Sequence, residues 1–356
     1  MKKIHKILTH HWQISLYLLI FSILFSIKII HNPLPFFDWD ESIYAQVGKE
    51  MTNNATLVPL WQGKSWLDKP PLVPLFYGLV MISTSFIQPE VSTRLATLYL
   101  SILALGLVYI LYFRVIKEQW LTTFVVIITS ISSIFLQRAQ VLNVDIFLLI
   151  GWIGYVLFYR KFWISLIFLS CAVYSKSLIG FYPVVIIGVY HLYRLFTKQI
   201  NLKALFQEYT KLFFHILILS IWYFGMYLRF GNDFLYQHFY ESHIKRVTSS
   251  IESHFGQRTF YIDLLFIEYG KYIWWSVLGF ALLIYQWARK YLSDKKLLYA
   301  LFIVPWFIFL NLTKTKIFWY GHPYMPQFAF LMIYPLCTLK KARLIYIAII
   351  IITVTN

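Results

Sequence analysis

Asp40 and Glu41 are the first residues whose type and spacing suggest chemistry. They directly precede the segment 42–51, in which Ile43, Val47 and Met51 recur at helical spacing. Carboxylates at the start of a helix are stabilised by its dipole, so one interpretation is an N-capping acidic pair in a solvated loop. The other is a general base or ligand near a membrane surface, because acids placed there are costly and usually functional.

A second cluster follows in the same stretch, where the chain reads Asp68-Lys69-Pro70-Pro71. The two prolines restrict the backbone and prevent a helix from continuing, so they present Asp68 and Lys69 at a defined place. A plain turn is one interpretation of this pattern. The other is an anion site, because a lysine held in this way is a point charge for a phosphate group.

Composition decides what kind of element must position these residues. Hydrophobic residues make up 59% of the 356 residues and charged residues 13%, whereas an ordinary globular domain is about 25% charged. Crossing a bilayer takes about 20 mostly apolar residues per helix, which leaves room for roughly ten or eleven spans. We therefore expect an all-α integral membrane protein. Residues 1–356 should form a single transmembrane domain without a separate soluble one.

The net charge of +17 raises the question of a nucleic-acid partner. The basic residues lie in short clusters between apolar runs, which is the positive-inside pattern of a membrane protein, so we expect no nucleic-acid partner. The basic start, Met1 to His11, precedes an apolar run without a cleavage site. This predicts a retained first span with a cytoplasmic N-terminus, in a cytoplasmic membrane of the bacterial type.

One of the twelve apolar runs does not fit a transmembrane arrangement. The runs are 12–30, 71–88, 92–113, 119–137, 146–159, 162–175, 178–196, 212–230, 261–288, 297–313, 317–337 and 343–355. Counting all of them as spans inverts the expected charge bias, since Arg114 and Arg160 would then lie outside. Residues 71–88 contain prolines and a glycine and are better placed along the outer interface. About eleven spans remain, and most acids then lie on the outer side.

This topology leaves two outer loops long enough to hold a site, 31–91 and 230–260. The cytoplasmic connections are all short. We therefore expect any chemistry to take place on the outer face of the membrane.

The motifs of the first outer loop resemble those of the GT-C glycosyltransferases. The closest resemblance is to enzymes that use polyprenyl- or dolichyl-phosphate sugars, including the lipid A aminoarabinose transferases and the protein O-mannosyltransferases of families 83 and 39. The matching residues are Asp40-Glu41, Tyr44-Ala45, Lys49-Glu50-Met51, Val58-Pro59, Gly63, Asp68-Lys69-Pro70-Pro71-Leu72 and Arg94-Leu95-Ala96. In that fold the segment after Lys-Pro-Pro is a juxtamembrane helix, which agrees with the charge argument for 71–88.

The resemblance continues along most of the chain. Asp145 matches a second carboxylate of the family at the outer mouth of a span, and Lys176 matches a lysine at the outer end of a later span. His243 and Arg246 fit a family motif, although Ser242 stands where the family usually has glutamate. Lys316 and Tyr320 fit the Lys-x3-Tyr-x2-Pro-x2-Pro pattern of a late outer loop.

The resemblance implies a glycosyltransferase that moves a hexose or pentose from a polyprenyl phosphate to an acceptor hydroxyl, with inversion. Asp40 and Asp145 are the expected catalytic residues, with Asp40 as the general base. The residues expected to bind substrate are Glu41, Tyr44, Lys69, Lys176, Arg246, Lys316 and Tyr320. The four basic residues among them would neutralise the departing lipid phosphate, and Tyr320 would donate a hydrogen bond to it.

Some relatives bind a divalent metal ion between the two outer loops. In this sequence Asp68, His243 and His254 are the expected ligands, and the alternative is a histidine that merely pairs with an acid. His31, His191 and His215 fit no such pattern and are predicted to be structural.

Two matters stay open at this point. The acceptor can be a lipid, a glycan or a protein hydroxyl, and the sugar is not specified by any residue pattern. A polytopic transporter or a flippase of lipid-linked sugars is the alternative function, since these also carry charged residues within a helix bundle. Such proteins are expected to show midplane polar residues or repeated halves, whereas the charges here collect on one face.

Overall fold

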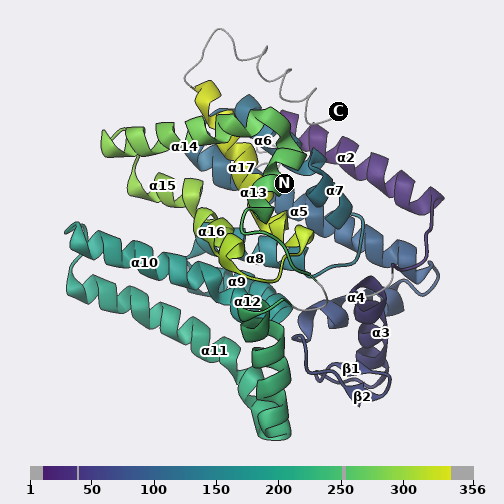
Figure 1. The fold of residues 1–356 in the computed structure, drawn as a ribbon. Helices are drawn as coiled ribbons and strands as arrows, with labels where there is room; N and C mark the ends of the chain where they lie inside the picture. The colour runs from purple at the N-terminus through teal and green to yellow at the C-terminus, as the bar shows by residue number, and fades with distance from the viewer. Residues whose placement is uncertain (1–10, 38–39, 251–253, 338–356) are drawn as a thin grey trace, which may run out of the picture.

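The computed structural model describes residues 11–37, 40–250 and 254–337 of the chain, and in them it is almost entirely helical (Figure 1). This confirms the predicted all-α class. The first third contains α2 (Trp12–His31), α3 (Asp40–Asn53), a hairpin of β1 (Leu60–Trp61) and β2 (Lys64–Ser65), α4 (Leu72–Ser83) and α5 (Pro89–Ile116). The two strands pair antiparallel, with Leu60 opposite Ser65.

The middle of the chain continues the bundle. Its elements are α6 (Gln119–Ile131), α7 (Ser133–Arg138), α8 (Asp145–Phe158), α9 (Phe162–Lys176), the 3₁₀-helix η1 (Ser177–Phe181), α10 (Tyr182–Phe196) and α11 (Leu202–Phe234). Helix α8 is buried at every position from Asp145 to Leu157, so it forms the centre of the molecule. In Figure 1 α10 and α11 lie side by side, and the Tyr209 hydroxyl of α11 donates to the Gly188 carbonyl of α10.

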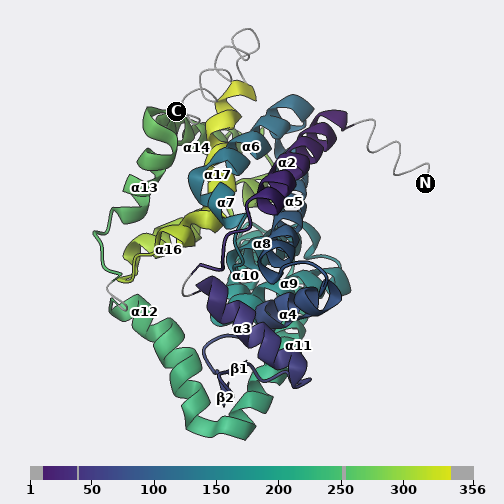
Figure 2. The ribbon, with the colours of Figure 1, turned by 90° about the vertical axis from the view of Figure 1, so that its right-hand side faces the viewer.

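The last third of the chain starts at the far end of α11 and returns to the helix bundle. Its elements are the π-helix η2 (Leu235–Ile244), α12 (Lys245–Thr248), α13 (Phe260–Tyr269), the 3₁₀-helix η3 (Gly270–Tyr272), α14 (Ile273–Ala288), α15 (Asp294–Leu301), α16 (Val304–Leu312), the 3₁₀-helix η4 (Phe318–Tyr324), α17 (Met325–Ile333) and the 3₁₀-helix η5 (Tyr334–Cys337). Figure 2 shows how the chain descends along α11, turns, and rises again through α12. The turn is made at Gly231, whose φ of 55° favours glycine.

Several helices have the length and polarity needed to cross a bilayer. Among the described residues, the segments Trp12–His31, Pro89–Ile116, Phe162–Phe196 and Leu202–Thr248 qualify, and α15 with α16 would add a fifth if this bent pair is one span. Helices α2 and α11 carry many exposed apolar side chains, as expected where lipid replaces water. The chain is therefore a multi-pass membrane protein, while the number of eleven spans stays a prediction. The expected run 343–355 lies outside the described residues.

Helix α4 has the character predicted for residues 71–88. Its 12 residues rise about 18 Å, well short of the roughly 30 Å hydrocarbon core. It packs on α3 at two glycines, where there is no room for a side chain. A Cβ at Gly48 would lie 2.3 Å from the Pro74 carbonyl oxygen, and a Cβ at Gly78 would lie 2.3 Å from the Gly48 carbonyl oxygen. This close contact joins the helix that begins at Asp40 to the helix that follows Lys69.

Candidate active site

A cavity of about 690 Å³ lies where four of the predicted segments meet. Its apolar wall comes from η1, the start of α10 and α16, and includes Leu178, Val185, Trp306 and Phe309. Its polar end is formed by Lys69, Lys176, Ser242, His243, Arg246 and Tyr320. No described acidic residue lines this cavity. The combination is an apolar channel that ends at a group of cations.

The local sequence explains how Lys69 and Lys176 reach this place. Pro71 caps the N-terminus of α4, so Lys69 precedes the helix on a restricted backbone. Lys176 is the last residue of α9, because Ser177 has a left-handed φ of 52° and breaks the apolar stretch 162–196 into α9 and α10. The lysine therefore lies at an interruption of the helix rather than along its apolar face.

Three cations at the polar end of the cavity are held by contacts with Tyr320 or Asp68. The Lys176 ammonium lies 4.3 Å from the centre of the Tyr320 ring. The Arg246 guanidinium donates to the hydroxyl of the same tyrosine at 3.1 Å. Lys69 pairs with the neighbouring Asp68 at 2.7 Å. Three of the four predicted basic residues thus meet around Tyr320 and the cavity wall.

Asp145 is fully buried at the start of α8 and is engaged by two cations. Its Oδ1 accepts from the Lys176 ammonium at 2.7 Å and its Oδ2 from Arg138 at 3.3 Å. A carboxylate stabilised on both oxygens is a poor proton acceptor, because its charged form is favoured. Of the two roles predicted for Asp145, this arrangement favours an orienting role over a shared base role.

Asp40 differs from Asp145 in its surroundings. It is the half-buried first residue of α3 and lies within electrostatic reach of Arg138, Asp145, Lys69 and Lys176. Burial raises the pKa of the Asp40 carboxyl above its ordinary value. The charge of Asp145 acts in the same direction, and the three cations oppose it. A carboxylate with a raised pKa suits a general base better than one with an ordinary pKa.

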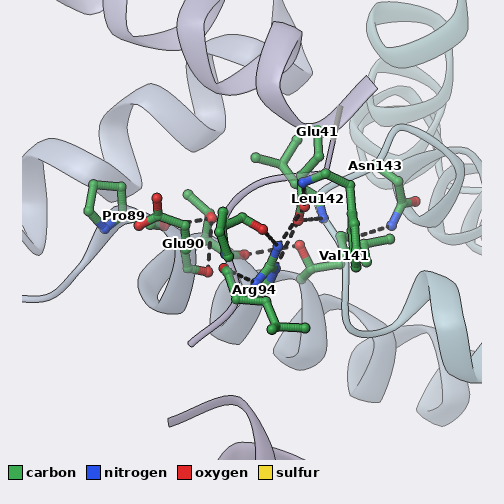
Figure 3. A network of polar contacts seen from close by, with 12 residues as sticks. Glu41, Pro89, Glu90, Arg94, Val141, Leu142 and Asn143 are labelled. Atoms are coloured by element: carbon green, nitrogen blue, oxygen red, sulfur yellow. Dashed lines mark hydrogen bonds and ion pairs between the residues drawn. The ribbon is translucent and has the colours of Figure 1, made fainter. Parts of the chain in front are cut away.

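Glu41 takes no direct part in the cavity and instead ties three segments together (Figure 3). The buried carboxylate accepts from Arg94 of α5 at 2.7 and 3.0 Å, and from the backbone N–H groups of Phe37 and Leu142 at 2.8 and 3.0 Å. Arg94 in turn donates to the carbonyls of Leu34 and Pro35. Glu41 therefore organises the loop that delivers Asp40.

Besides Glu41, two further residues predicted to bind substrate do not line the cavity. Tyr44 is buried in α3, where its ring lies edge-on to Trp66 at 5.9 Å. The Lys316 ammonium donates to the carbonyls of Leu310 and Asn311 at 2.8 and 2.9 Å, at the end of α16. The structure thus gives Lys316 the position of a helix C-terminal cap rather than of a phosphate ligand.

The three expected metal ligands are not gathered into one set. The Asp68 carboxylate accepts from Lys69 and from the Ser242 hydroxyl. Burial opposes its ionisation, but Lys69, Ser242 and Arg246 lower the pKa of Asp68 to about 2. His243 lies on the cavity wall, whereas the His254 ring faces Trp319. In the described ranges no group of three His, Cys, Asp or Glu side chains is placed to hold a metal ion. These residues do not fit a metal centre as they stand.

Arg138 and His322 join the site without having been predicted as site residues. Arg138 is buried beside Asp145 and packs over the Trp319 ring at 5.3 Å. His322 is buried and stacks on Phe135 at 5.0 Å. Arg138 lies seven residues before Asp145, and His322 lies inside the Lys-x3-Tyr-x2-Pro-x2-Pro pattern, directly before Pro323. Their nearness to these predicted site residues is the signal that could have found them.

Comparison with known proteins identifies the fold. No protein-family model and no curated protein sequence matches the chain. ArnT from Cupriavidus metallidurans bound to undecaprenyl phosphate has a similar solved structure, with a TM-score of 0.71 at 15% identity, over 94% of this chain and 63% of that one. The apo state of the same protein gives 0.66 at 14%, over 92% and 59%.

The likeness to ArnT confirms the predicted GT-C resemblance and the GT-C fold. The chain spans about three fifths of the length of the two ArnT chains that it matches.

Proposed function

We propose that this protein is a membrane glycosyltransferase that transfers a sugar from a polyprenyl-phosphate donor to an acceptor hydroxyl on the outer face of the membrane. The observation that carries this proposal is the cavity of about 690 Å³, with its apolar wall and its cationic end. A polyprenyl-phosphate sugar has a matching apolar part and anionic part, because its long hydrocarbon chain is joined directly to a phosphate.

The apolar wall suits the lipid part of such a donor. Leu178, Val185 and Phe309 line the cavity and are exposed by 49%, 62% and 40%. In a bilayer these positions would face acyl chains rather than water. A donor could therefore reach the cationic end from the side, without its hydrocarbon chain leaving the membrane.

The cationic end suits the phosphate. Arg246 can form two parallel hydrogen bonds with phosphate oxygens, and Lys69 and Lys176 act as point charges. Asp68 and Asp145 each hold one of these lysines in place without lining the cavity. The likeness to a protein solved with undecaprenyl phosphate supports the same class of donor here.

The proposed reaction is a single displacement. Asp40 accepts the proton of the acceptor hydroxyl, and the resulting oxygen forms a bond to the anomeric carbon. The bond between that carbon and the phosphate oxygen breaks as this happens, so the configuration inverts. The electron pair leaves on the lipid phosphate, whose growing negative charge is neutralised by Lys69, Lys176 and Arg246.

Substitution of Arg246 tests the phosphate assignment. Arg246→Gln should weaken the binding of undecaprenyl phosphate by roughly 10- to 100-fold, because a hydrogen bond to a charged group contributes about 1.5–3 kcal/mol. Binding is measured on purified protein in detergent. Arg258→Gln is the matched control, since Arg258 is an exposed arginine of the same outer loop and does not line the cavity. Equal loss in both variants would argue against a specific phosphate site.

The pH dependence of transfer tests the assignment of Asp40. A raised pKa keeps Asp40 protonated, and inactive as a base, up to a higher pH than an ordinary aspartate. Transfer should therefore fall as pH is lowered through this raised value, and rise to a plateau above it. The measurement is kcat against pH at saturating donor. A rate that stays constant down to the ordinary range of aspartate would contradict the assignment.

The function itself is tested by reconstitution. Purified protein in liposomes is supplied with a labelled polyprenyl-phosphate sugar and a cell-envelope extract as the source of acceptor. Transfer of label to a new product supports the proposal, and its mass identifies the acceptor. Movement of the labelled lipid between leaflets without transfer would instead favour a flippase.

A further inference from the structure

His238 is a completely buried residue of the π-helix η2 that joins two distant parts of the chain. Its Nδ1 lies 2.8 Å from the Leu67 carbonyl oxygen and its Nε2 lies 2.9 Å from the Ser177 hydroxyl. A carbonyl oxygen can only accept, so Nδ1 carries the proton. In a neutral imidazole Nε2 then accepts from Ser177. Both ring nitrogens are thus used to connect other segments.

The two partners of His238 adjoin the two lysines of the cavity. Leu67 stands two residues before Lys69, and Ser177 directly follows Lys176. The Ser177 backbone has φ of 52°, a conformation that non-glycine residues seldom adopt unless their surroundings hold them. His238 therefore supports both the helix break beside the buried Lys176 and the bend that carries Lys69.

The π-helix η2 places a second residue, Ser242, against the segment that carries Lys69. The Ser242 hydroxyl, on the same face of η2, donates to the Asp68 carboxylate, which pairs with Lys69. His243 and Arg246 follow and line the cavity. π-Helical segments are rare and often occur at functional sites. One short stretch of the second outer loop thus supplies Arg246 and also contacts the backbone before Lys69 and the Ser177 hydroxyl after Lys176.

We infer that His238 is a positioning residue that brings Lys69, Lys176 and Arg246 into one anion site. The inference rests on the proposed function in one respect, the identity of the anion as a lipid phosphate. The connection itself follows from the two hydrogen bonds. Without them, Ser242 still joins η2 to Asp68 and Tyr320 still joins Lys176 to Arg246. The link that His238 makes between the Lys69 segment and the Lys176 segment is lost, and the geometry of the three cations around one phosphate is then less well fixed.

The test uses His238→Phe. This substitution removes both hydrogen bonds and keeps an aromatic ring to stack on Phe234, whose ring centre lies 4.8 Å from that of His238 in the wild-type protein. Its affinity for undecaprenyl phosphate should fall roughly tenfold, with a higher KM for donor and a smaller change in kcat. Amide hydrogen exchange should rise in both 66–72 and 175–181. Ser177→Ala should give part of these effects and add nothing in the His238→Phe background, because the two residues share one interaction.

The matched control is His215→Phe. His215 is also buried, its ring nitrogens lie 3.2 Å from the Tyr155 hydroxyl and 3.2 Å from the Phe162 carbonyl oxygen, and its ring stacks on Phe162. Its partners Tyr155 and Phe162 do not line the cavity, and Phe162 lies at the opposite end of α9 from Lys176. A comparable loss of thermal stability, with unchanged lipid affinity and unchanged exchange in 66–72 and 175–181, is expected for this variant.

The outcomes separate this inference from the proposed function. Wild-type lipid affinity and unchanged exchange in His238→Phe would overturn the positioning role, even if the protein transfers sugar. If the wild-type protein fails to bind undecaprenyl phosphate, the proposed donor is wrong, and exchange in the two segments still decides the inference. Increased exchange in both segments supports the positioning role, and unchanged exchange in both segments overturns it.

Discussion

Asp40→Asn should lower kcat for sugar transfer by roughly 10²- to 10⁴-fold, the usual contribution of a general base. Asparagine keeps the size of the side chain, but it cannot accept the proton of the acceptor. Asp145 is not placed to substitute for it, since both of its oxygens are held by Lys176 and Arg138. The affinity for undecaprenyl phosphate should change little, because Asp40 does not line the cavity.

The measurement is single-turnover transfer from a labelled donor, compared with the binding of undecaprenyl phosphate by the same preparation. Asp263→Asn is the matched control: Asp263 is an exposed aspartate in the first turn of another helix, predicted on the same side of the membrane. Asp263→Asn should transfer at the wild-type rate. If Asp40→Asn retains full transfer, another group removes the proton and the mechanism is wrong at this step.

The helices could be predicted from the sequence largely because a bilayer imposes strict rules on it. Apolar runs predicted a break between residues 175 and 178, and α9 does end at Lys176. Prolines and the charge bias separated 71–88 from the spans, and α4 is a helix too short to cross a bilayer. The helical spacing of apolar residues predicted a helix in 42–51, and α3 extends it by two residues at each end. These features depend on local sequence.

The site could be predicted only where a motif already implied a role. Lys69, Lys176, Arg246 and Tyr320 come together as expected. Lys316 lies in the same motif as Tyr320, yet its ammonium donates to the carbonyls of Leu310 and Asn311 near the end of α16. No spacing in the sequence indicates this contact.

His238 shows why the rest could not be predicted from the sequence. Its partners are 171 and 61 residues away in the chain, and they appear only once the second outer loop has folded onto the first. No spacing rule connects such positions. The pairing of Glu41 with Arg94, 53 residues apart, belongs to the same class of contact and leads to a second large effect.

Glu41→Gln should lower the free energy of unfolding by about 3–5 kcal/mol, which is typical of breaking a buried ion pair from one side. The side chain is 3% exposed and that of Arg94 is 6% exposed, so the guanidinium would be left in a buried place without its counter-charge. Glutamine also loses one acceptor and cannot satisfy Arg94, Phe37 and Leu142 together. The effect is measured by unfolding the purified protein with heat or denaturant in mild detergent.

The matched comparison is Glu241→Gln, which breaks an ion pair of equal length in another setting. Glu241 and Lys245 are also 2.7 Å apart, but both are partly exposed on one face of a helix, where water screens the charges. Glu241→Gln should therefore unfold almost as the wild-type protein does. If the two variants lose equal stability, the network in Figure 3 has no special role in holding the first outer loop. If Glu41→Gln alone is destabilised, it should also transfer sugar slowly, because the loop that carries Asp40 loses the contacts that place it.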